Sequence, residues 1–425
     1  MTKTTAKYLV ITLLILAGFS STVSAQSISI IVETTPNTDI RAVVAALGGT
    51  LLDSTDGNLH LVSVPAMPSI YPAGVKYVES DNVQVSPGVY GAVFTVSPTT
   101  AAGFYRDQPA MQRVNLPRAL PHATGRGLVI ADINAMVDVA HPALVGHLTS
   151  GAEFLHGTCT NRSTLNDAAV GFLDDAAVGF LDQSHAASLD PPTAAFLTQS
   201  KASFLDPLTA SSLDRMSPAH GHGTMVAGIL AVMAPDAMIM PLRAFDDRGC
   251  GTTYNISKAI KYAVSHGAQV INMSFGISGQ AQTLKNTIDE AVKAGAIVVA
   301  AAGNSNTAVP QYPAAYPGVL GVAATDLADV KTSFSNYGST IFVSAPGAHI
   351  ISAYPGGYYA ELSGTSFSAP LVAAEAALVR SLKTSGWTGS IAAGVDNIDA
   401  VNPSYVGQLG AGRINLLKAL GGLRQ

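Results

Sequence analysis

The pattern of apolar and polar positions near the start of the chain predicts a small α+β module. Residues 27–32 alternate as a strand does, and residues 40–47 carry apolar side chains at the i, i+3, i+4, i+7 spacing of a helix face. Two further strand-like segments, 60–64 and 75–78, are bounded by Gly and Pro. We therefore expect residues 26–85 to form a separate, compact α+β module.

The pattern changes twice after this module. Residues 86–120 are rich in Pro, Thr, Ala and Gly and have little periodicity, so we interpret them as a linker. Across residues 121–425, apolar runs alternate with amphipathic helical patterns, which is typical of a mostly parallel sheet covered on both faces. The second unit is thus predicted to be a doubly wound α/β domain. Its predicted strands are 128–131, 237–242, 270–275, 296–302, 319–324 and 341–345, and its clearest helices are 256–264 and 284–292.

An eight-residue repeat interrupts this pattern at about residues 165–214. A helix turns about 100° per residue, so side chains eight positions apart form no apolar stripe. Several prolines also interrupt an extended chain. We interpret the segment as a surface insertion grown by tandem duplication, with a lid or binding role as the alternative. The repeated leucines are Leu165, Leu173, Leu181, Leu189, Leu197, Leu205 and Leu213.

Composition and charge exclude several classes of protein. A chain of 425 residues with 48% hydrophobic content can bury a large core. Its 28 acidic and 23 basic residues form no long run of either sign, so no nucleic-acid partner is predicted. Two cysteines, Cys159 and Cys250, exclude a disulfide framework and leave a single bridge open.

The first 25 residues have the pattern of an export signal. Lys3 and Lys7 give a basic start, residues 8–19 are apolar, and residues 23–25 are small. A membrane anchor needs about 20 apolar residues, more than this stretch provides. We predict a signal peptide over residues 1–25 and a secreted protein, extracellular or periplasmic, that leaves the membrane once the signal is removed.

Three short segments carry groups that acyl transfer needs: a nucleophile, a base and a donor for the oxyanion. Ser366 opens a long apolar helix, where backbone N–H groups suit an oxyanion, although an ordinary N-cap serine fits as well. His222 precedes a predicted helix at 225–233, and its simpler interpretation is a buried structural histidine. Asn304 ends an apolar strand at the sheet edge where active sites gather, although turn chemistry also explains it.

These segments, in this order, resemble the subtilase family of serine proteases. They are the His-Gly-Thr of residues 222–224, the Ala-Ala-Gly-Asn of 301–304 and the Gly-Thr-Ser-x-x-x-Pro of 364–370. Weaker matches extend the resemblance over about residues 120–418. A lipase or esterase would instead place its nucleophile in Gly-x-Ser-x-Gly, which Ser366 lacks.

The resemblance implies a secreted serine endopeptidase. Ser366 would attack the scissile carbonyl, His222 would take and return the proton, and Asn304 would donate to the oxyanion. Polypeptide substrates would bind as an added strand. The substrate-binding residues implied in this way are Gly249, Gly251, Ser274, Phe275 and Gly276. Ile277 follows where many relatives have another glycine, which leaves the shape of the primary specificity pocket open.

The module of residues 26–85 resembles the inhibitory propeptides of such proteases, which are cut away after assisting folding. It has few polar groups suited to catalysis, and a plain N-terminal domain is the alternative. We expect it to act as an intramolecular inhibitor of a monomeric enzyme.

The residue that should orient the histidine departs from the family pattern. Counting back seven positions from His141 reaches Asn134, where the family has an aspartate. An amide cannot stabilise an imidazolium by charge, and this exchange costs a serine protease about 10⁴ in turnover. Asp132 lies two residues earlier on the same strand face, and a buried carboxylate needs a partner.

We therefore predict that the strand ends at Asp132, that the next turn carries two extra residues, and that Asp132 orients His222. Two alternatives are weak activity with Asn134 in that role, and a catalytically inactive, peptide-binding relative.

Two further departures concern calcium. Ala143 stands where many relatives have a calcium-ligating aspartate, and the chain is short after Met233, where calcium-binding relatives carry a loop. Calcium takes six to eight oxygen ligands, and both sources are missing. We predict no tight calcium site, no other metal and no cofactor.

Overall fold

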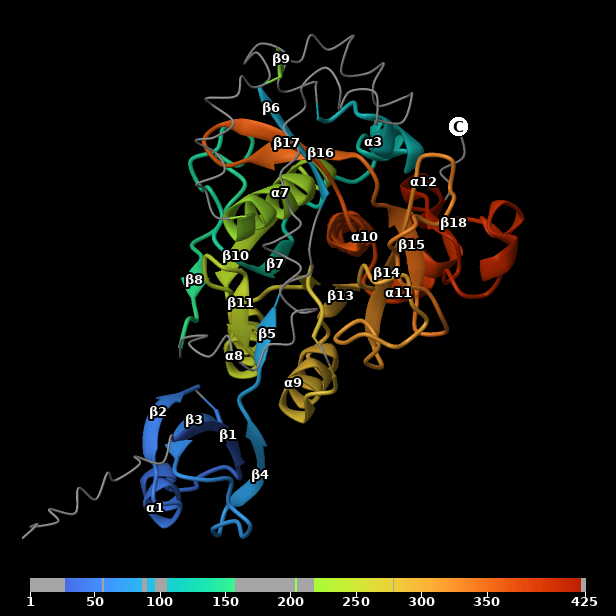
Figure 1. Ribbon diagram of the computed structural model, residues 1–425. Coiled ribbons are helices and arrows are strands. Elements are labelled where there is room, and N and C mark those ends of the chain that lie inside the picture. Colours follow the sequence, from blue (N-terminus) through green and yellow to red (C-terminus); the bar gives the residue numbers. More distant parts are fainter. Residues whose placement is uncertain are drawn as a thin grey trace, which may run out of the picture.

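The structure is a computed structural model that describes residues 27–55, 57–85, 90–95, 105–156, 203–204, 218–277 and 279–421. The signal peptide, Cys159 and nearly all of the eight-residue repeat lie outside these residues. Figure 1 shows a small N-terminal module below a larger domain built around a nine-stranded sheet.

The N-terminal module is a four-stranded antiparallel sheet, in the order β2-β3-β1-β4, with one helix packed on it. Val43 and Val44 of the helix join the apolar cluster of the sheet. The helix and three strands predicted here are present; β2 was missed because its residues are not buried in alternation. The elements are β1 (Ile28–Thr34), α1 (Ile40–Ala46), β2 (Thr50–Ser54), β3 (Leu59–Val64) and β4 (Val75–Ser80).

The large domain has the predicted doubly wound α/β fold. Its sheet has the order β18-β19-β15-β14-β13-β12-β7-β10-β8, and apart from the β18–β19 pair its strands are parallel. The central strands are short apolar runs buried on both faces, as expected for a covered parallel sheet. They are β7 (Val129–Asn134), β10 (Met238–Arg243), β12 (Val270–Met273), β13 (Ile297–Ala301), β14 (Val319–Thr325) and β15 (Val343–Pro346), with β8 (Ala152–Glu153), β18 (Val395–Asp396) and β19 (Arg413–Ile414) toward the edges.

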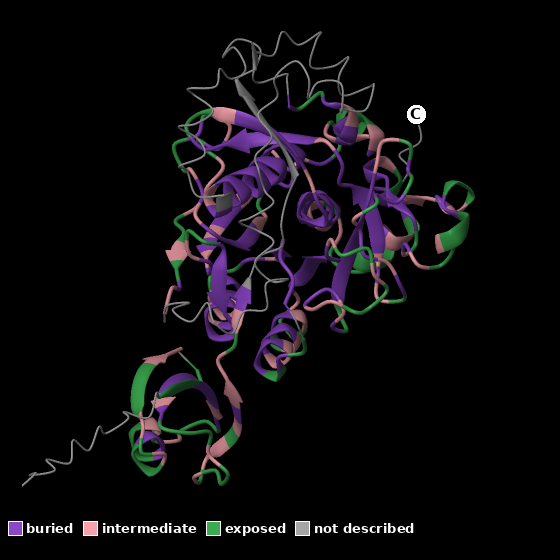
Figure 2. Cartoon of the chain, viewed as in Figure 1, coloured by how far each residue is buried: buried purple, intermediate pink, exposed green. Residues whose placement is uncertain are grey.

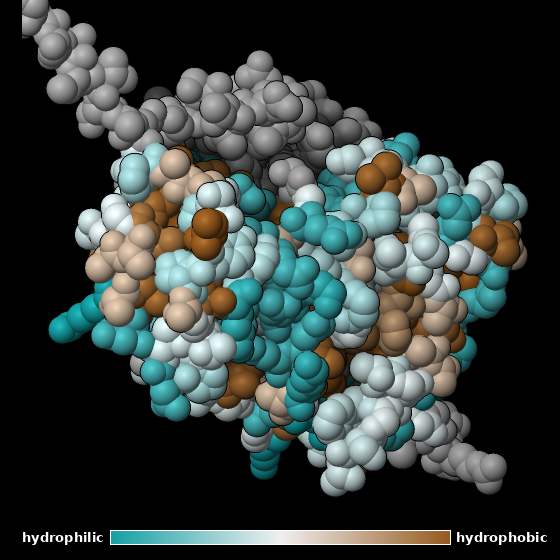
Figure 3. All heavy atoms as spheres, turned by 90° about the horizontal axis from the view of Figure 1, so that it is seen from below, coloured by the Kyte–Doolittle hydropathy of each residue, from teal (hydrophilic) through white to brown (hydrophobic). Residues whose placement is uncertain are grey.

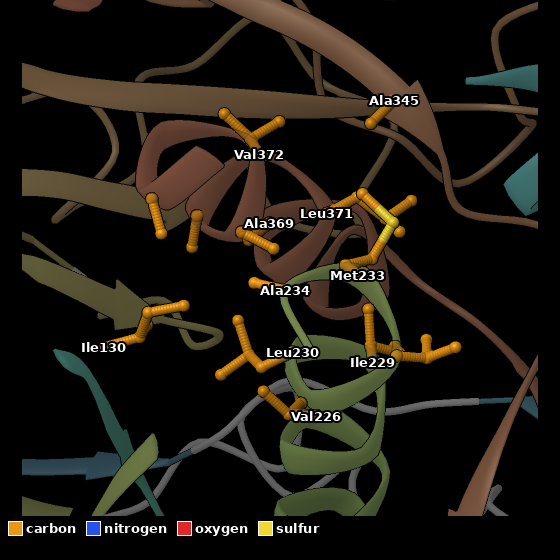
Figure 4. Close-up of a cluster of buried hydrophobic side chains, with 14 of the residues drawn as sticks. Ile130, Val226, Ile229, Leu230, Met233, Ala234, Ala345, Ala369, Leu371 and Val372 are labelled. Atoms are coloured by element: carbon orange, nitrogen blue, oxygen red, sulfur yellow. The ribbon is translucent and has the colours of Figure 1, made fainter. Parts of the chain in front are cut away.

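Alternate residues of the central strands pack into two different cores. Ile130 of β7 joins a core with α7 (Pro218–Met233) and α10 (Thr365–Leu382), which Figure 4 shows in close-up. Its neighbours Ala131 and Ile133 join the core of α8 (Thr253–Ser265) and α9 (Gln282–Lys293). Because side chains alternate along a strand, even-numbered positions of β7 face α7 and α10. In Figure 2, α10 is coloured as buried over most of its length, and its buried residues are Thr365–Val379.

The remaining elements lie around this sheet. Two further small sheets, β11-β5 and β16-β17-β6-β9, join segments that are far apart in sequence. The remaining strands are β5 (Val83–Val85), β6 (Tyr90–Thr95), β9 (Ser203–Phe204), β11 (Cys250–Thr252), β16 (Ile350–Tyr354) and β17 (Tyr358–Ser363). Within the described residues, the other helices are α3 (Pro109–Arg113), α4 (Leu116–Ala119), α11 (Trp387–Ala393), α12 (Leu416–Ala419) and the 3-10 turns η4 (Asp399–Val401) and η5 (Pro403–Tyr405).

Three expectations need correction. The range 86–120, interpreted as a linker, contains β6, which pairs with β17, and two short helices whose Met111 and Leu116 are fully buried. Helix α7 begins at Pro218 rather than at 225, so His222 lies inside it. Strand β7 continues to Asn134, in register with β10, so no extra residues follow Asp132.

Candidate active site

The carboxyl ends of neighbouring parallel strands bring the predicted site residues together. Asn134 is the last residue of β7, Ser274 follows β12 directly, and Asn304 follows β13 after two residues. These strands are adjacent in the sheet. Helix α10 begins at Thr365 at the same edge, where its first residues hydrogen-bond to Ser274 and Asn304. An open α/β fold places its binding crevice at this edge.

Ser366 is the second residue of α10 and is fully buried in the full-length chain. Its Oγ donates a hydrogen bond to the backbone carbonyl of Ser274 over 3.0 Å. Pro370 has no N–H, so the Ser366 carbonyl lacks its helical donor, and Ser274 Oγ donates to it over 2.8 Å. This reciprocal pair fixes the start of α10 against the segment that follows β12.

Asn304 is held with its carboxamide in a defined direction. Its Oδ1 accepts hydrogen bonds from the backbone N–H (2.9 Å) and the hydroxyl (2.8 Å) of Thr365. The nitrogen end therefore points the other way, and a Cβ on Gly364 would lie 3.4 Å from it. Gly303 has φ +99°, and a Cβ there would lie 1.6 Å from Gln311 Oε1, so only glycine lets the chain deliver Asn304 here.

His222 lies in α7 with 2% of its surface exposed, and its ring centroid is 5.8 Å from that of Phe367, the neighbour of Ser366. Its Nδ1 is 2.9 Å from Oδ1 of Asn134. Burial lowers the pKa of His222 to about 4, so the imidazole is neutral at neutral pH. A neutral imidazole is the form in which histidine acts as a general base.

Asp132 does not contact His222, which corrects the direct contact expected from the sequence. Within the described residues its carboxylate accepts from Asn272 Nδ2 (2.9 Å) and from Asn134 Nδ2 (3.5 and 3.4 Å). Burial raises the pKa of Asp132 to about 7. Asn134, the residue at the ungapped family position, is the one that contacts the histidine.

The expected substrate-binding residues lie on two segments, and the one after β12 contacts Ser366 through Ser274. Gly249 and Gly251 flank Cys250 at β11, and β11 pairs antiparallel with β5 from the end of the N-terminal module. Phe275 is buried, with its ring 4.9 Å from Phe245, and a Cβ on Gly276 would lie 2.2 Å from Gln311 Nε2. Cys250 takes part in a disulfide bond.

Comparison with known proteins shows the family of the chain. The model of the subtilase family matches residues 125–396 of the chain. The chain belongs to the subtilase family. Like the named proteases below, this subtilase is a serine-type endopeptidase by class.

Two curated relatives and one solved structure illustrate the likeness. Thermitase from Thermoactinomyces vulgaris is 32% identical over 75% of this chain and 97% of its own length. A thermophilic serine proteinase from Bacillus sp. (strain AK1) is 44% identical over 38% of this chain and 43% of its own. Fervidolysin from Fervidobacterium pennivorans, a keratinolytic enzyme related to subtilisin, has a TM-score of 0.67 at 21% identity, covering 94% of this chain and 61% of fervidolysin. The last likeness concerns the fold.

The subtilase shows neither a metal cluster nor a membrane helix in the part of the chain that the structure describes. No three His, Cys, Asp or Glu side chains are grouped there to hold a metal ion. No helix there is both long and apolar enough to cross a membrane. In the face that Figure 3 presents, hydrophobic residues are scattered among hydrophilic ones.

Sequence reasoning missed two residues that connect the site. Asn272 donates to Asp132 and, over 3.0 Å, to Ser274 Oγ, and Thr365 holds Asn304 by two hydrogen bonds. Asn272 left a signal in the sequence, because it is a polar residue within the apolar run of residues 270–275. A buried amide in such a strand needs hydrogen-bonding partners.

Proposed function

We propose that this subtilase is a secreted endopeptidase that cleaves polypeptides through an acyl-enzyme on Ser366. The observation that carries the proposal is that Ser366, His222 and Asn304 meet at one sheet edge, with the His222 ring beside the start of α10. Ser366 Oγ attacks the scissile carbonyl while His222 Nε2 takes its proton and later gives it to the leaving amine. Asn304 Nδ2 and the Ser366 N–H stabilise the oxyanion.

Asn134 limits the rate of this chemistry. Its Oδ1 accepts a hydrogen bond from Nδ1–H of His222, but a neutral amide stabilises the imidazolium less than a carboxylate does. We therefore expect a slower enzyme than a subtilase in which a single aspartate at this position orients the histidine, with no second carboxyl beside it. The alternative, a catalytically inactive protein that still binds peptides, is favoured by the same residue.

Substrate is expected to bind as a strand along Gly249–Thr252 and beside Ser274–Gly276. The edge of β11 suits this because β5 already pairs with it antiparallel, in the way that an added peptide strand would. Gln84 of β5 strengthens that pairing through its amide, which donates to Thr253 Oγ1 over 3.2 Å.

The N-terminal module is, in this proposal, an intramolecular inhibitor. Glu79 accepts from the N–H groups of Gln282 (3.0 Å) and Thr283 (2.9 Å) at the start of α9, where a negative charge is favoured. Asp81 accepts from Tyr254 N near the start of α8 over 2.9 Å, and Asp53 forms an ion pair with Lys258. Together with the buried Ser366, these contacts support a latent full-length chain. Export through residues 1–25 and a monomeric enzyme complete the proposal.

A fluorophosphonate probe tests the proposal, because it labels only an activated serine. We expect the exported wild type to shorten at its N-terminus and become labelled, whereas Ser366→Ala stays full length and unlabelled. Ser368→Ala is the matched control, since Ser368 lies on the same helix and donates to the backbone at residues 345 and 346 instead. A wild type that is neither shortened nor labelled would support the inactive, peptide-binding alternative.

A further inference from the structure

We propose that Asp132 is a positioning residue that acts through the amide of Asn134 to keep the proton of neutral His222 on Nδ1. The inference rests on the proposed function, because it concerns the base of the same reaction. It explains how a subtilase with asparagine at this position can still present Nε2 as an acceptor.

The orientation of the Asn134 amide decides which nitrogen of His222 carries the proton. The amide has one accepting end and one donating end. If Oδ1 faces Nδ1, then Nδ1 must carry the proton and Nε2 can act as a base. If the NH₂ end faces Nδ1, the proton moves to Nε2, and this wrong tautomer is what makes the exchange so costly in a serine protease.

Two neighbours select the productive orientation. The N–H of Ala135 donates to Asn134 Oδ1 over 2.9 Å, and the two carboxylate oxygens of Asp132 lie 3.5 and 3.4 Å from Nδ2. If the amide were rotated, its NH₂ group would face the N–H of Ala135, so two donors would meet there. Its oxygen would face the carboxylate of Asp132, so two acceptors would meet there. Asn134 is 4% exposed and Asp132 is fully buried, so water cannot offset either mismatch.

Asp132 is in turn held from the neighbouring strand. Asn272 on β12 donates to it and to Ser274 Oγ, which donates to the Ser366 carbonyl. A continuous series of hydrogen bonds therefore connects His222 with the backbone carbonyl of Ser366, and every residue in it is buried. The even spacing along β7 makes this possible, because residues 132 and 134 share one face.

Among the described residues, the side chains that hydrogen-bond to Asp132 are two neutral amides, and no charged neighbour shifts its pKa. Strand β12 contributes the neutral Asn272, β10 places Pro241 opposite it in register, and α7 contributes His222 beyond the Asn134 amide. The titratable group among these is His222. Burial raises the pKa of Asp132 to about 7, so its ionisation falls within the range in which a neutral protease is assayed. The strength of the Asn134 orientation should therefore increase as pH rises through this value.

The first experiment measures the tautomer itself, without reference to activity. Full-length protein with ¹⁵N-labelled histidine, with the His222 signals assigned by comparison with His222→Ala, should show the proton on Nδ1. In Asp132→Val a large share of the population should move to the Nε2–H form. Glu375→Leu removes another fully buried carboxyl, on α10, and should leave the tautomer unchanged. An unchanged tautomer in Asp132→Val would overturn the inference.

A second experiment separates positioning from a general structural role. Asp132→Val should lower kcat about 10²-fold or more in the native background, within the roughly 10⁴-fold limit for a lost triad aspartate. In an Asn134→Asp background the same change should raise kcat, because two adjacent carboxyls no longer compete for one proton. Equal losses in both backgrounds would show that Asp132 is only structural.

These outcomes also distinguish the inference from the proposed function. A wild type that is inactive but holds the proton on Nδ1, and loses this preference in Asp132→Val, sustains the inference and refutes the proposed activity. If Asp132→Val does not fold, Asp132→Asn serves instead, because it keeps one acceptor oxygen for Asn134 Nδ2. That variant should shift the tautomer partly, and no shift in it would refute the inference.

Discussion

The active site has a nucleophile half, with Ser366 and Asn304, and a base half, with His222. The side chains of the two halves are held in place in different ways. In the nucleophile half, Ser366 and Asn304 are the residues that the subtilase pattern expects, and each is fixed by a direct contact with a neighbouring segment. In the base half, the residue that contacts His222 has changed, and its orientation depends on Asp132 behind it. A motif position in the second half therefore cannot be interpreted without the residue two positions away.

The supporting elements explain this difference. The nucleophile lies on a helix in which Pro370 cannot donate to the Ser366 carbonyl, and the hydroxyl of Ser274 donates there instead, so one direct hydrogen bond holds the helix start. The base is oriented by a strand, and a strand presents two consecutive even positions to the same neighbours. Two side chains on one face of a strand can thus orient the histidine together, a role that a single aspartate has in other subtilases.

The largest expected effect tests the nucleophile half. Asn304→Leu should lower kcat about 10²–10³-fold with little change in KM, as expected for a lost oxyanion donor. Thr365→Val should cost less, because the backbone N–H of residue 365 still holds Asn304 Oδ1. Steady-state kinetics on a peptide substrate would measure both. A change confined to KM in Asn304→Leu would place Asn304 in substrate binding instead.

An intermediate effect tests the base half through its pH dependence. Burial lowers the pKa of His222 to about 4, so protonation of the base should give kcat/KM an acid limb near that value, below the separate change that the ionisation of Asp132 produces near pH 7. In the Asp132→Val/Asn134→Asp double variant, a carboxylate beside the imidazole should move this limb up by about 1–3 pH units. Profiles of kcat/KM against pH for the two proteins measure the shift. An unmoved limb would mean that residue 134 does not control the base.

The same pKa has a consequence for stability. The pKa of His222 is lower in the folded state than its ordinary value of 6.5. Its contribution to the free energy of unfolding is therefore fully present above pH 6.5. This contribution should be lost as the pH falls from 6.5 towards 4.

The smallest effect concerns α10 away from the chemistry. Glu375 is fully buried there, its two oxygens have no hydrogen-bond partner among the described residues, and burial raises its pKa well above the ordinary value. The folded state is therefore penalised increasingly as pH rises above about 4.5, where the unfolded chain ionises. Glu375→Leu should stabilise the fold by about 1–3 kcal/mol at pH 8, and clearly less at pH 4.

Thermal unfolding at the two pH values measures this difference, with kcat unchanged. Glu361→Leu is the matched control, because Glu361 is also buried but accepts from His349 over 2.8 Å. Its loss should lower the melting temperature. A destabilised Glu375→Leu would show that the carboxyl has a favourable partner.

The fold and the nucleophile half were predictable from the sequence. Fully apolar strands between amphipathic helices identify a covered parallel sheet, and the motifs around Ser366 and Asn304 identify their positions. The start of α7 was not predictable, because glycines weaken its helical pattern; a Cβ at Gly223 would lie 2.5 Å from the Met136 carbonyl, a contact that sequence does not reveal.

The end of β7 was missed for a related reason. Asp132, Ile133 and Asn134 continue the alternation of a strand and also suit a turn, so the sequence alone did not decide between them. Pairing of Asn134 with Arg243 extends the strand and places the amide against His222. Polar side chains buried at a sheet edge are positioned by their partners on other elements, such as Asn272 on β12.

The contact between Asp132 and Asn134 also has an evolutionary consequence. Asparagine replaced by aspartate at position 134 alone sets two carboxyls side by side, and loss of Asp132 alone leaves the amide undirected, so either single step is harmful. The two changes together give a single aspartate at position 134 that orients the histidine directly. The two positions are thus expected to show sign epistasis: lineages of this enzyme should inherit them as a pair, and an ancestor that crossed from one arrangement to the other had to pass through a poorer enzyme.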